Sequence, residues 1–367
     1  SPDIPLNVSR SYLQSDSNVK KISAHITKKV ADRLNQLFKD KRDEYEKKWD
    51  NLKIFIEYGM LTEEKFAEKA ESFFLLKNTE GSYFTFEEYE KLIKDNQTDK
   101  DKNLVYLYTN SPVEQYTFVE AARSKGYDVL VMDDILTTPL INKLEQKDTK
   151  KKFVRVDSDV VEHLIQKEDT PVDTLSWEEK QDLSPIFQGV APETDKVSYI
   201  VDFKDLGENG SPITITRNEW MRRMKDMSQF QNGMGFYGDM PENLNLVVNT
   251  AHPLVKEILK EKEGKLHESL LPLQEEIKAK KAEENLLEAA RKDKKWDEIP
   301  QEDKDKMEVV RKELSDLEEN KRNQLKEFGK NNKVAKQLVD LALLANGLLK
   351  GADLDRFVKR SVELIQK

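Results

Sequence analysis

The sequence predicts a multidomain protein of mixed α+β and α/β class: a helical coil, a small βαβαβ unit, and an α+β C-terminal domain that ends in a helix pair. Three observations support this class. Apolar residues recur every three or four positions from Asn18 to Phe38, three short apolar runs alternate with helix-start signals over residues 103–157, and two helices with apolar faces come last.

The composition is typical of acidic, helix-rich domains. The 367 residues are 36% charged and 37% hydrophobic, with a net charge of −9, which suits two or three domains and argues against a nucleic-acid partner, because phosphate binding needs a basic face. The absence of cysteine excludes disulfides. We expect a cytoplasmic protein, since no signal peptide precedes Ser1 and no apolar stretch approaches the roughly twenty residues of a membrane span. Ser1 is not a natural start, so we expect a fragment.

A helical coil is expected over residues 17–98, after a short segment 1–16. The apolar positions of its first helix follow the helical period: Ile22, Ile26, Val30, Leu34 and Leu37. The second helix is expected to end at Gly59, because glycine is common just after a helix. Thr85 and Glu88 have the spacing of a capping box, which predicts a further helix start.

Residues 99–170 are expected to form a small α/β subdomain. Its strands are expected at 104–108, 127–132 and 153–156, and Ser111-Pro112 and Thr138-Pro139 signal the starts of the helices between them. The alternation β-α-β-α-β predicts parallel pairing.

Four polar residues follow the first two of these strands: Thr109, Asn110, Asp133 and Asp134. The carboxyl ends of parallel strands are where α/β enzymes carry their active sites. No phosphate-binding glycine loop accompanies them, so a structural role for the subdomain is favoured.

A linker is expected over residues 171–195, where three prolines stand among polar residues. The C-terminal domain, 196–367, then begins with strands at 197–203 and 213–216, which could form a hairpin with a long loop around Asn209-Gly210.

The next helix carries Trp220, Met221 and Met224. Methionines at helical spacing are typical of a core, and spacing alone favours that interpretation. Their density also suits a surface that accepts many partners.

Two apparent sites are rejected. Gly233, Gly235 and Gly238 spell the dinucleotide fingerprint, but a helix precedes them and a strand follows, the reverse of what the fingerprint requires. The four histidines are scattered without ligand-like spacing, so no metal site is expected.

Residues 262–332 are dominated by Glu, Lys, Asp, Leu and Ala, and Pro300 divides them into two arms of an expected helical hairpin with weak hydrophobic packing. The two helices that follow carry apolar stripes that must cover each other or a partner. The residues of these stripes that we assign to a dimer interface are Leu338, Leu341, Leu348, Leu354, Phe357, Val358 and Ile365.

The opening run Asp3 to Gln14, DIPLNVSRSYLQ, resembles the catalytic-loop motif of the ninety-kilodalton heat-shock protein chaperone family, which commonly reads D-L-P-L-N-x-S-R-E-x-L-Q. Ile4 replaces Leu and Ser11 replaces Glu. The resemblance continues in TFEEY, in the βαβαβ segment, in WMRRM, in NTAHPLV at Asn249 to Val255, and in the final helices, all in the order of bacterial members of the family. The hairpin 262–332 is longer than the family usually has.

The resemblance implies a fragment holding the later middle domain and the C-terminal domain of a homodimeric, ATP-driven chaperone for non-native proteins in the stress response. It implies that Arg10 contacts the γ-phosphate of ATP on a missing N-terminal domain, that Asn7 and Gln14 support that loop, and that Trp220, Met221 and Met224 face clients. ATP and Mg would act in the full-length protein, with none bound to this fragment and no ATPase activity in it. The tail that binds tetratricopeptide co-chaperones is missing at Gln366-Lys367.

Two other function classes remain open. One is an elongated scaffold that binds partners through the charged hairpin, and it predicts that loss of Arg10 changes nothing. The other is a small α/β enzyme working near Asn110 and Asp133, and it predicts a small-molecule activity in the fragment alone.

Overall fold

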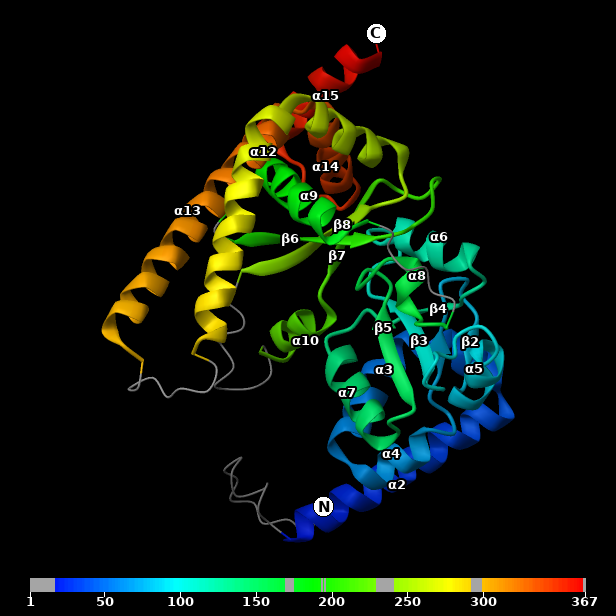
Figure 1. The fold of residues 1–367 in the computed structure, drawn as a ribbon. Coiled ribbons are helices and arrows are strands. Elements are labelled where there is room, and N and C mark those ends of the chain that lie inside the picture. Colours follow the sequence, from blue (N-terminus) through cyan, green and yellow to red (C-terminus); the bar gives the residue numbers. More distant parts are fainter. Residues whose placement is uncertain are drawn as a thin grey trace. The chain divides into compact units, whose positions relative to one another are not determined.

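The computed structural model describes residues 17–168, 175–192, 194, 196–228, 241–291 and 299–365. By its internal contacts the chain divides into two compact units (Figure 1). Unit 1 holds Ser1–Thr170 and Glu219–Asp239, and unit 2 holds Pro171–Asn218 and Met240–Lys367. The mixed α+β and α/β class predicted from the sequence is confirmed.

Unit 1 begins with the helical coil, formed by α2 (Ser17–Asp40), α3 (Arg42–Thr62) and α4 (Glu64–Ala70). The expectation that Gly59 ends the second helix is wrong, because α3 continues to Thr62. The glycine serves packing instead. A Cβ built on Gly59 would lie 2.7 Å from Cε1 of Phe66, so the aromatic ring of α4 fits only against a residue without a side chain.

A two-stranded antiparallel sheet, β1 (Leu76–Lys77) and β2 (Tyr83–Phe84), leads into α5 (Phe86–Ile93). The predicted capping box is confirmed: the Glu88 backbone N–H donates to the Thr85 hydroxyl, and the Thr85 backbone N–H donates to the Glu88 carboxylate.

The βαβαβ unit is confirmed, with parallel strands in the order β4-β3-β5. Its elements are β3 (Leu104–Thr109), α6 (Tyr116–Ser124), β4 (Val129–Val131), α7 (Thr137–Lys147) and β5 (Lys151–Arg155), followed by the short α8 (Val161–Leu164). Alternate residues of β3 enter two different cores, with Tyr106 on one face of the sheet and Leu107 on the other. A strand buried on both faces explains the unbroken apolar run LVYLY.

Unit 2 contains a three-stranded sheet in the order β6-β8-β7, built from β6 (Val197–Lys204), β7 (Ile213–Arg217) and β8 (Glu242–Asn249). The predicted hairpin is wrong. The strand β8 lies between β6, with which it is parallel, and β7, with which it is antiparallel. Leu244, Leu246 and Val248 of β8 are all buried, as expected of the central strand of a sheet.

The segment expected to be a linker is largely a helix, α9 (Trp177–Val190), with a capping box between Ser176 and Glu179. Its buried residues Leu183, Ile186 and Phe187 belong to the core of unit 2. Proline composition suggested a linker, but Pro185 lies inside this helix and is buried.

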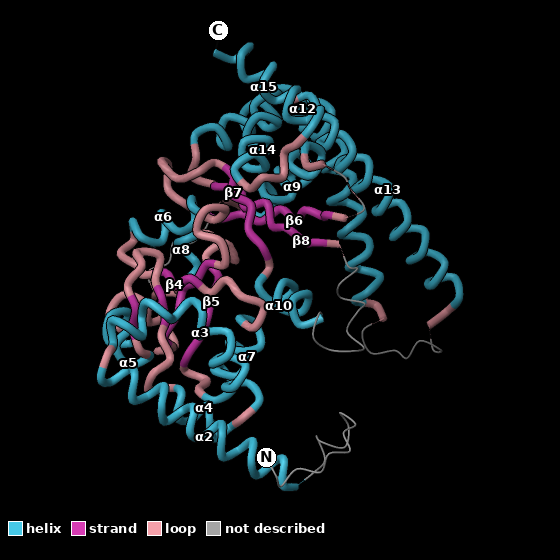
Figure 2. Tube along the Cα trace, turned by 180° about the vertical axis from the view of Figure 1, so that it is seen from behind, coloured by secondary structure: helices cyan, strands magenta, loops and turns pink. Residues whose placement is uncertain are grey.

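Two long helices, α12 (Pro253–Ala289) and α13 (Gln301–Asn331), form the expected helical hairpin and lie side by side (Figures 1 and 2). Salt bridges such as Lys280–Glu313, with Nζ and Oε2 2.7 Å apart, join the two arms. The hairpin is also held to α9, because the buried carboxylate of Asp182 pairs with Lys262 of α12 at 2.8 Å and with Lys321 of α13 at 2.7 Å. The charged segment is therefore anchored in the core of its unit.

The chain then forms α14 (Lys333–Ala345) and α15 (Gly351–Ile365). Asn332 caps α14 by accepting a hydrogen bond from the Ala335 backbone N–H at 2.8 Å. The two helices are joined by side chains of Gln337 and Asp340, which accept hydrogen bonds from Arg360.

Candidate functional site

The sequence-predicted site residues fall into three groups with different outcomes. Arg10, Gln14 and Asn7, expected to serve a nucleotide, lie outside the described residues, as do Gly233, Gly235 and Gly238. Trp220, Met221 and Met224 are described and lie on one helix, α10 (Glu219–Ser228). The expected interface residues lie on α14 and α15 and in the connection between them.

The helix α10 belongs to unit 1 by its contacts, and it packs on the α/β subdomain through its polar side. None of its side chains is buried, so the core interpretation favoured by methionine spacing is wrong. The indole of Trp220 is 58% exposed, and Met221 and Met224 are partly exposed. An exposed tryptophan beside two accessible methionines offers apolar, adaptable contact area.

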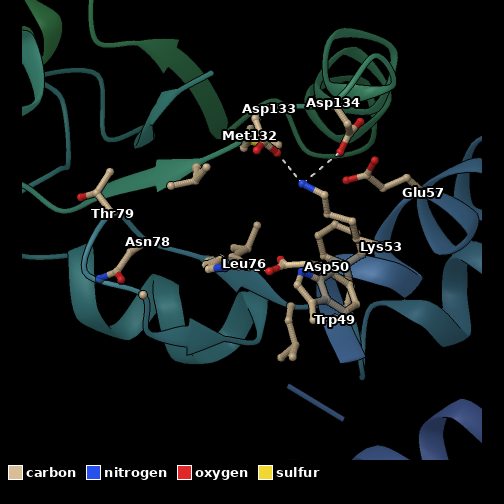
Figure 3. A pocket seen from close by; sticks show the side chains of 15 residues that line it. Trp49, Asp50, Lys53, Glu57, Leu76, Asn78, Thr79, Met132, Asp133 and Asp134 are labelled. Carbon is tan, nitrogen blue, oxygen red and sulfur yellow. Dashed lines mark hydrogen bonds and ion pairs between the residues drawn. The ribbon is translucent and has the colours of Figure 1, made fainter. Parts of the chain in front are cut away.

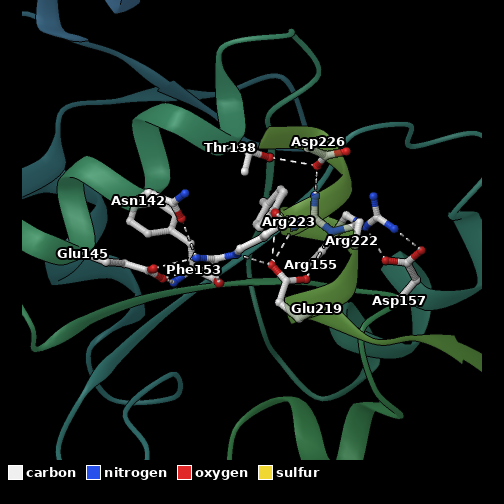
Figure 4. Close-up of polar contacts among 11 residues, drawn as sticks. Thr138, Asn142, Glu145, Phe153, Arg155, Asp157, Glu219, Arg222, Arg223 and Asp226 are labelled. Atoms are coloured by element: carbon white, nitrogen blue, oxygen red, sulfur yellow. Dashed lines mark hydrogen bonds and ion pairs between the residues drawn. The ribbon is translucent and has the colours of Figure 1, made fainter. Parts of the chain in front are cut away.

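A network of charged side chains attaches α10 to the subdomain (Figure 4). Arg223 donates to the Glu145 carboxylate of α7 at 2.6 Å and to the backbone carbonyl oxygen of Phe153 at 2.5 Å. Arg222 donates to the Tyr108 hydroxyl of β3 at 2.5 Å. Charge-assisted hydrogen bonds of this kind are stronger than neutral ones, so they orient the helix.

Within the network, Glu219 accepts hydrogen bonds from both arginines, at 2.7 Å from Arg222 and 2.8 Å from Arg223. Burial alone would raise the pKa of Glu219, but the charges and hydrogen bonds of Arg222 and Arg223 outweigh burial and lower it. Asp226 completes the attachment, since the Thr138 hydroxyl of α7 donates to it at 2.9 Å. The sequence places these charges at helical spacing on α10, but their partners lie on distant elements.

The interface residues divide between core and surface. Leu338 and Phe357 are buried in the core of unit 2, and Leu348 and Leu354 are partly buried against it. Leu341 is 44% exposed and Val358 is 50% exposed. The side chain of Ile365 lies outside what the structure describes. The outward-facing apolar surface of these helices is therefore narrower than the predicted stripe.

A cavity of about 490 Å³ lies in unit 1, between α3, the β1 segment and the residues that follow β4 (Figure 3). Asp133 and Asp134 line it, as the strand-end argument suggested, and the structure adds Lys53 and Glu57 of α3. The sequence analysis missed Lys53 and Glu57, because two charged residues four positions apart usually form an ordinary solvent-exposed pair on the surface of one helix. Asn110 and Thr109 do not line this cavity.

The part of the chain that the structure describes lacks two other kinds of site. No cluster of three or more His, Asp or Glu side chains there has a geometry that could hold a metal ion. No described helix combines the length and apolar character needed to cross a membrane.

Comparison with known proteins gives consistent results. A family model described as Hsp90 protein matches residues 1–272. The chain is 51% identical over 365 residues to the chaperone protein HtpG of Bacteroides thetaiotaomicron, a match that covers all of this chain and 54% of that protein. It is 48% identical over 365 residues to HtpG of Porphyromonas gingivalis, covering 53% of that protein. HtpG of Wolbachia pipientis is 28% identical over 271 residues, or 71% of this chain. The chain thus spans about half the length of the relatives it matches.

Proposed function

The chain belongs to the Hsp90 protein family, and from that premise we propose that it forms the later middle domain and the C-terminal domain of an ATP-driven, homodimeric chaperone that binds non-native proteins in the cytoplasm. The observation that carries this proposal is the 51% identity, over the whole chain, to a protein named as a chaperone. The roles of individual residues rest on the motif resemblance together with the exposure and contacts of the described side chains.

Client binding is assigned to the outward face of α10. The exposed Trp220 supplies aromatic contact area, and Met221 and Met224 supply flexible apolar groups that suit partners of varied shape. The opposite, charged side of the helix is engaged with α7 and β5 through Arg223. A helix held by its polar side keeps its apolar side accessible.

Nucleotide hydrolysis is assigned to the full-length protein. The opening loop would deliver the Arg10 guanidinium to the γ-phosphate of ATP bound elsewhere in that protein, with Mg as the metal, while Asn7 and Gln14 shape the loop. A guanidinium suits this task because it stays charged and donates several hydrogen bonds in a fixed plane.

Dimerisation is assigned to α14 and α15. The exposed Leu341 and Val358 offer apolar area on the two helices, while Leu338 and Phe357 hold the helices against their own unit. Pairing two copies about a two-fold axis would bury the exposed side chains in a four-helix arrangement.

The chaperone assignment is tested by aggregation of a heat-unfolded model protein followed by light scattering. The wild-type chain should suppress aggregation, and Trp220→Ser should weaken that suppression severalfold with little change in melting temperature. Trp177→Ser is the matched control, because Trp177 is 63% exposed on a different helix. Equal suppression by both variants and the wild type would contradict the assignment of α10 and favour the charged hairpin as the binding element.

A further inference from the structure

The cavity beside β4 combines an apolar floor with an acidic wall (Figure 3). Its floor includes the buried side chains of Trp49, Phe74 and Leu76. Its wall carries Glu57 of α3 together with Asp133 and Asp134. A volume of about 490 Å³ is within the usual range of small-ligand pockets.

The three carboxyl groups of the wall share one nearby cation. The Lys53 ammonium pairs with Asp133, and its Nζ lies 3.6 Å from Oδ2 of Asp134. The other charged groups that line the cavity, Asp50 and Lys77, pair with each other at 2.9 Å. With every carboxyl ionised, the wall therefore has an excess of negative charge.

Glu57 is hydrogen-bonded to Asp134, but one of its two carboxyl oxygens has no partner among the described residues. Its side chain lies on the cavity wall, the residue is only 4% exposed, and its Oε2 accepts no hydrogen bond from the part of the chain that the structure describes. In Figure 3 its carboxyl group is directed toward the Lys53 ammonium and Asp134. A buried oxygen without a hydrogen-bond partner is unfavourable, so a hydrogen-bond donor at this position would stabilise it.

Burial is the main cause that raises the pKa of Glu57, to about 9, and the neighbouring Asp134 raises it further while Lys53 opposes the shift. Asp133 acts in the same direction as Asp134. At neutral pH Glu57 therefore carries a proton, and the wall has two carboxylates and one ammonium. A second cation could replace that proton.

We propose that this cavity binds an organic monocation, an ammonium or guanidinium group on a short apolar stem, with the charged group among Glu57, Asp133 and Asp134 and the stem against Trp49, Phe74 and Leu76. A metal ion is disfavoured, because no described cluster has metal-binding geometry and the Lys53 ammonium already occupies one side of the carboxylates. A free alkylamine and a lysine side chain of a peptide share this chemistry. The inference does not depend on the proposed chaperone function.

Calorimetric titration of the chain with n-pentylammonium tests the proposal, with n-pentanol as the uncharged probe of the same stem. Pentylammonium should bind saturably and pentanol should bind far more weakly. Binding should release close to one proton, measured by repeating the titration in buffers of different ionisation enthalpy. Because the proton leaves Glu57, the affinity should rise about tenfold between pH 7 and pH 8.

Two variants locate the site. Glu57→Gln cannot release a proton, so it should weaken pentylammonium binding and abolish its pH dependence. Asp50→Asn is the control on the same cavity, because it removes a carboxylate that pairs with Lys77 and leaves Glu57 in place; it should keep the proton release and the pH dependence of the wild type. Three results would each overturn the proposal: no saturable binding, equal binding of pentanol, or binding to the wild type without proton release. All three are measured on the wild type, so none depends on a variant that fails to fold.

A second arm distinguishes the sources of the cation. N-acetyl-leucyl-lysine amide is titrated beside pentylammonium, with the matched norleucine peptide as its uncharged control. Tighter binding of the lysine peptide than of pentylammonium identifies a protein side chain as the natural occupant. Binding of pentylammonium alone identifies a free amine.

Discussion

Arg223 of α10 donates a 2.5 Å hydrogen bond to the backbone carbonyl oxygen of Phe153 in β5, a residue seventy positions earlier in the chain. The same guanidinium pairs with Glu145 of α7 at 2.6 Å. One side chain thus joins the helix to a strand and to a second helix of the α/β subdomain. Arg223 is therefore one of the side chains that orient α10, and with it Trp220, on that subdomain.

The attachment of α10 should weaken in Arg223→Ala, although the contacts of Arg222 and Asp226 remain. The substitution leaves Glu145 and the Phe153 carbonyl without this donor, and hydrogen bonds to charged groups contribute about 1.5–3 kcal/mol each. Hydrogen exchange of the α10 backbone amides should accelerate about tenfold or more. Arg33→Ala is the control, since Arg33 is exposed and hydrogen-bonds Gln36 on its own helix. Unchanged exchange in Arg223→Ala would show that other contacts hold α10.

The close crossing of α9 and α13 predicts a strong effect of one methyl group. A Cβ at Gly329 would lie 2.2 Å from the carbonyl oxygen of Ile186, so Gly329→Ala should destabilise unit 2 by about 1–3 kcal/mol through overpacking. Gly264→Ala is the matched control, because nothing lies within 4 Å of its Cβ position on α12, and it should stabilise the helix by about 0.5–1 kcal/mol. Thermal unfolding measures both, and similar melting temperatures would argue against the tight crossing.

Glu57 predicts a pH-dependent stability. Its pKa is about 9 in the folded protein against 4.5 ordinarily, so the unfolded chain loses this proton first and the folded state becomes less stable as pH rises from about 5 to about 9. Glu57→Gln keeps the neutral shape and removes the titration. Without any added amine, the melting temperature of Glu57→Gln relative to that of the wild type should therefore rise with pH across that window. A constant difference between the two proteins would contradict a buried, protonated Glu57.

How far the sequence predicts this fold depends on whether the signal is local. The capping box at Thr85 and the parallel unit from Leu104 rest on neighbouring residues, and both were predictable. The pairing of β6 with β8 joins residues far apart in the sequence, such as Val201 and Leu246. The central strand, β8, comes after an intervening helix. The hairpin prediction paired β6 with β7, the next strand in the sequence, and was therefore wrong.

The same distinction applies to the candidate sites. Asp133 and Asp134 were placed correctly at a strand end by topology. The pairing of Lys53 with Asp133 joins positions eighty residues apart, and nothing in the local sequence of α3 distinguishes Lys53 from a solvated lysine. Likewise, the polar residues of α10 follow helical spacing, but their partners Glu145 and Phe153 become apparent only in three dimensions.

The assignment of Arg10 predicts a separation of ATP binding from hydrolysis in the full-length protein. Arg10→Ala should retain nucleotide binding, since the pocket lies elsewhere, and should lose hydrolysis. Arginine contributions to phosphoryl transfer reach about 10³ to 10⁵ in rate, but a smaller loss is expected if domain docking limits turnover. Steady-state hydrolysis and nucleotide titration measure the two steps. Near wild-type hydrolysis in the variant would remove Arg10 from the catalytic loop.

The final helices predict a dimer that forms without nucleotide. Leu341 on α14 and Val358 on α15 are large apolar side chains about half exposed to water, and a second copy would cover them. Leu341→Glu with Val358→Glu places charge on this surface while sparing the buried Leu338 and Phe357. Each unit should therefore stay folded, which circular dichroism measures. Light scattering at micromolar concentration should report a dimer for the wild type and a monomer for the double variant. Val309→Glu, on the equally exposed Val309 of α13, should remain dimeric because it adds charge outside the proposed seam. A monomeric wild type, or a double variant that stays dimeric, would remove the interface from α14 and α15.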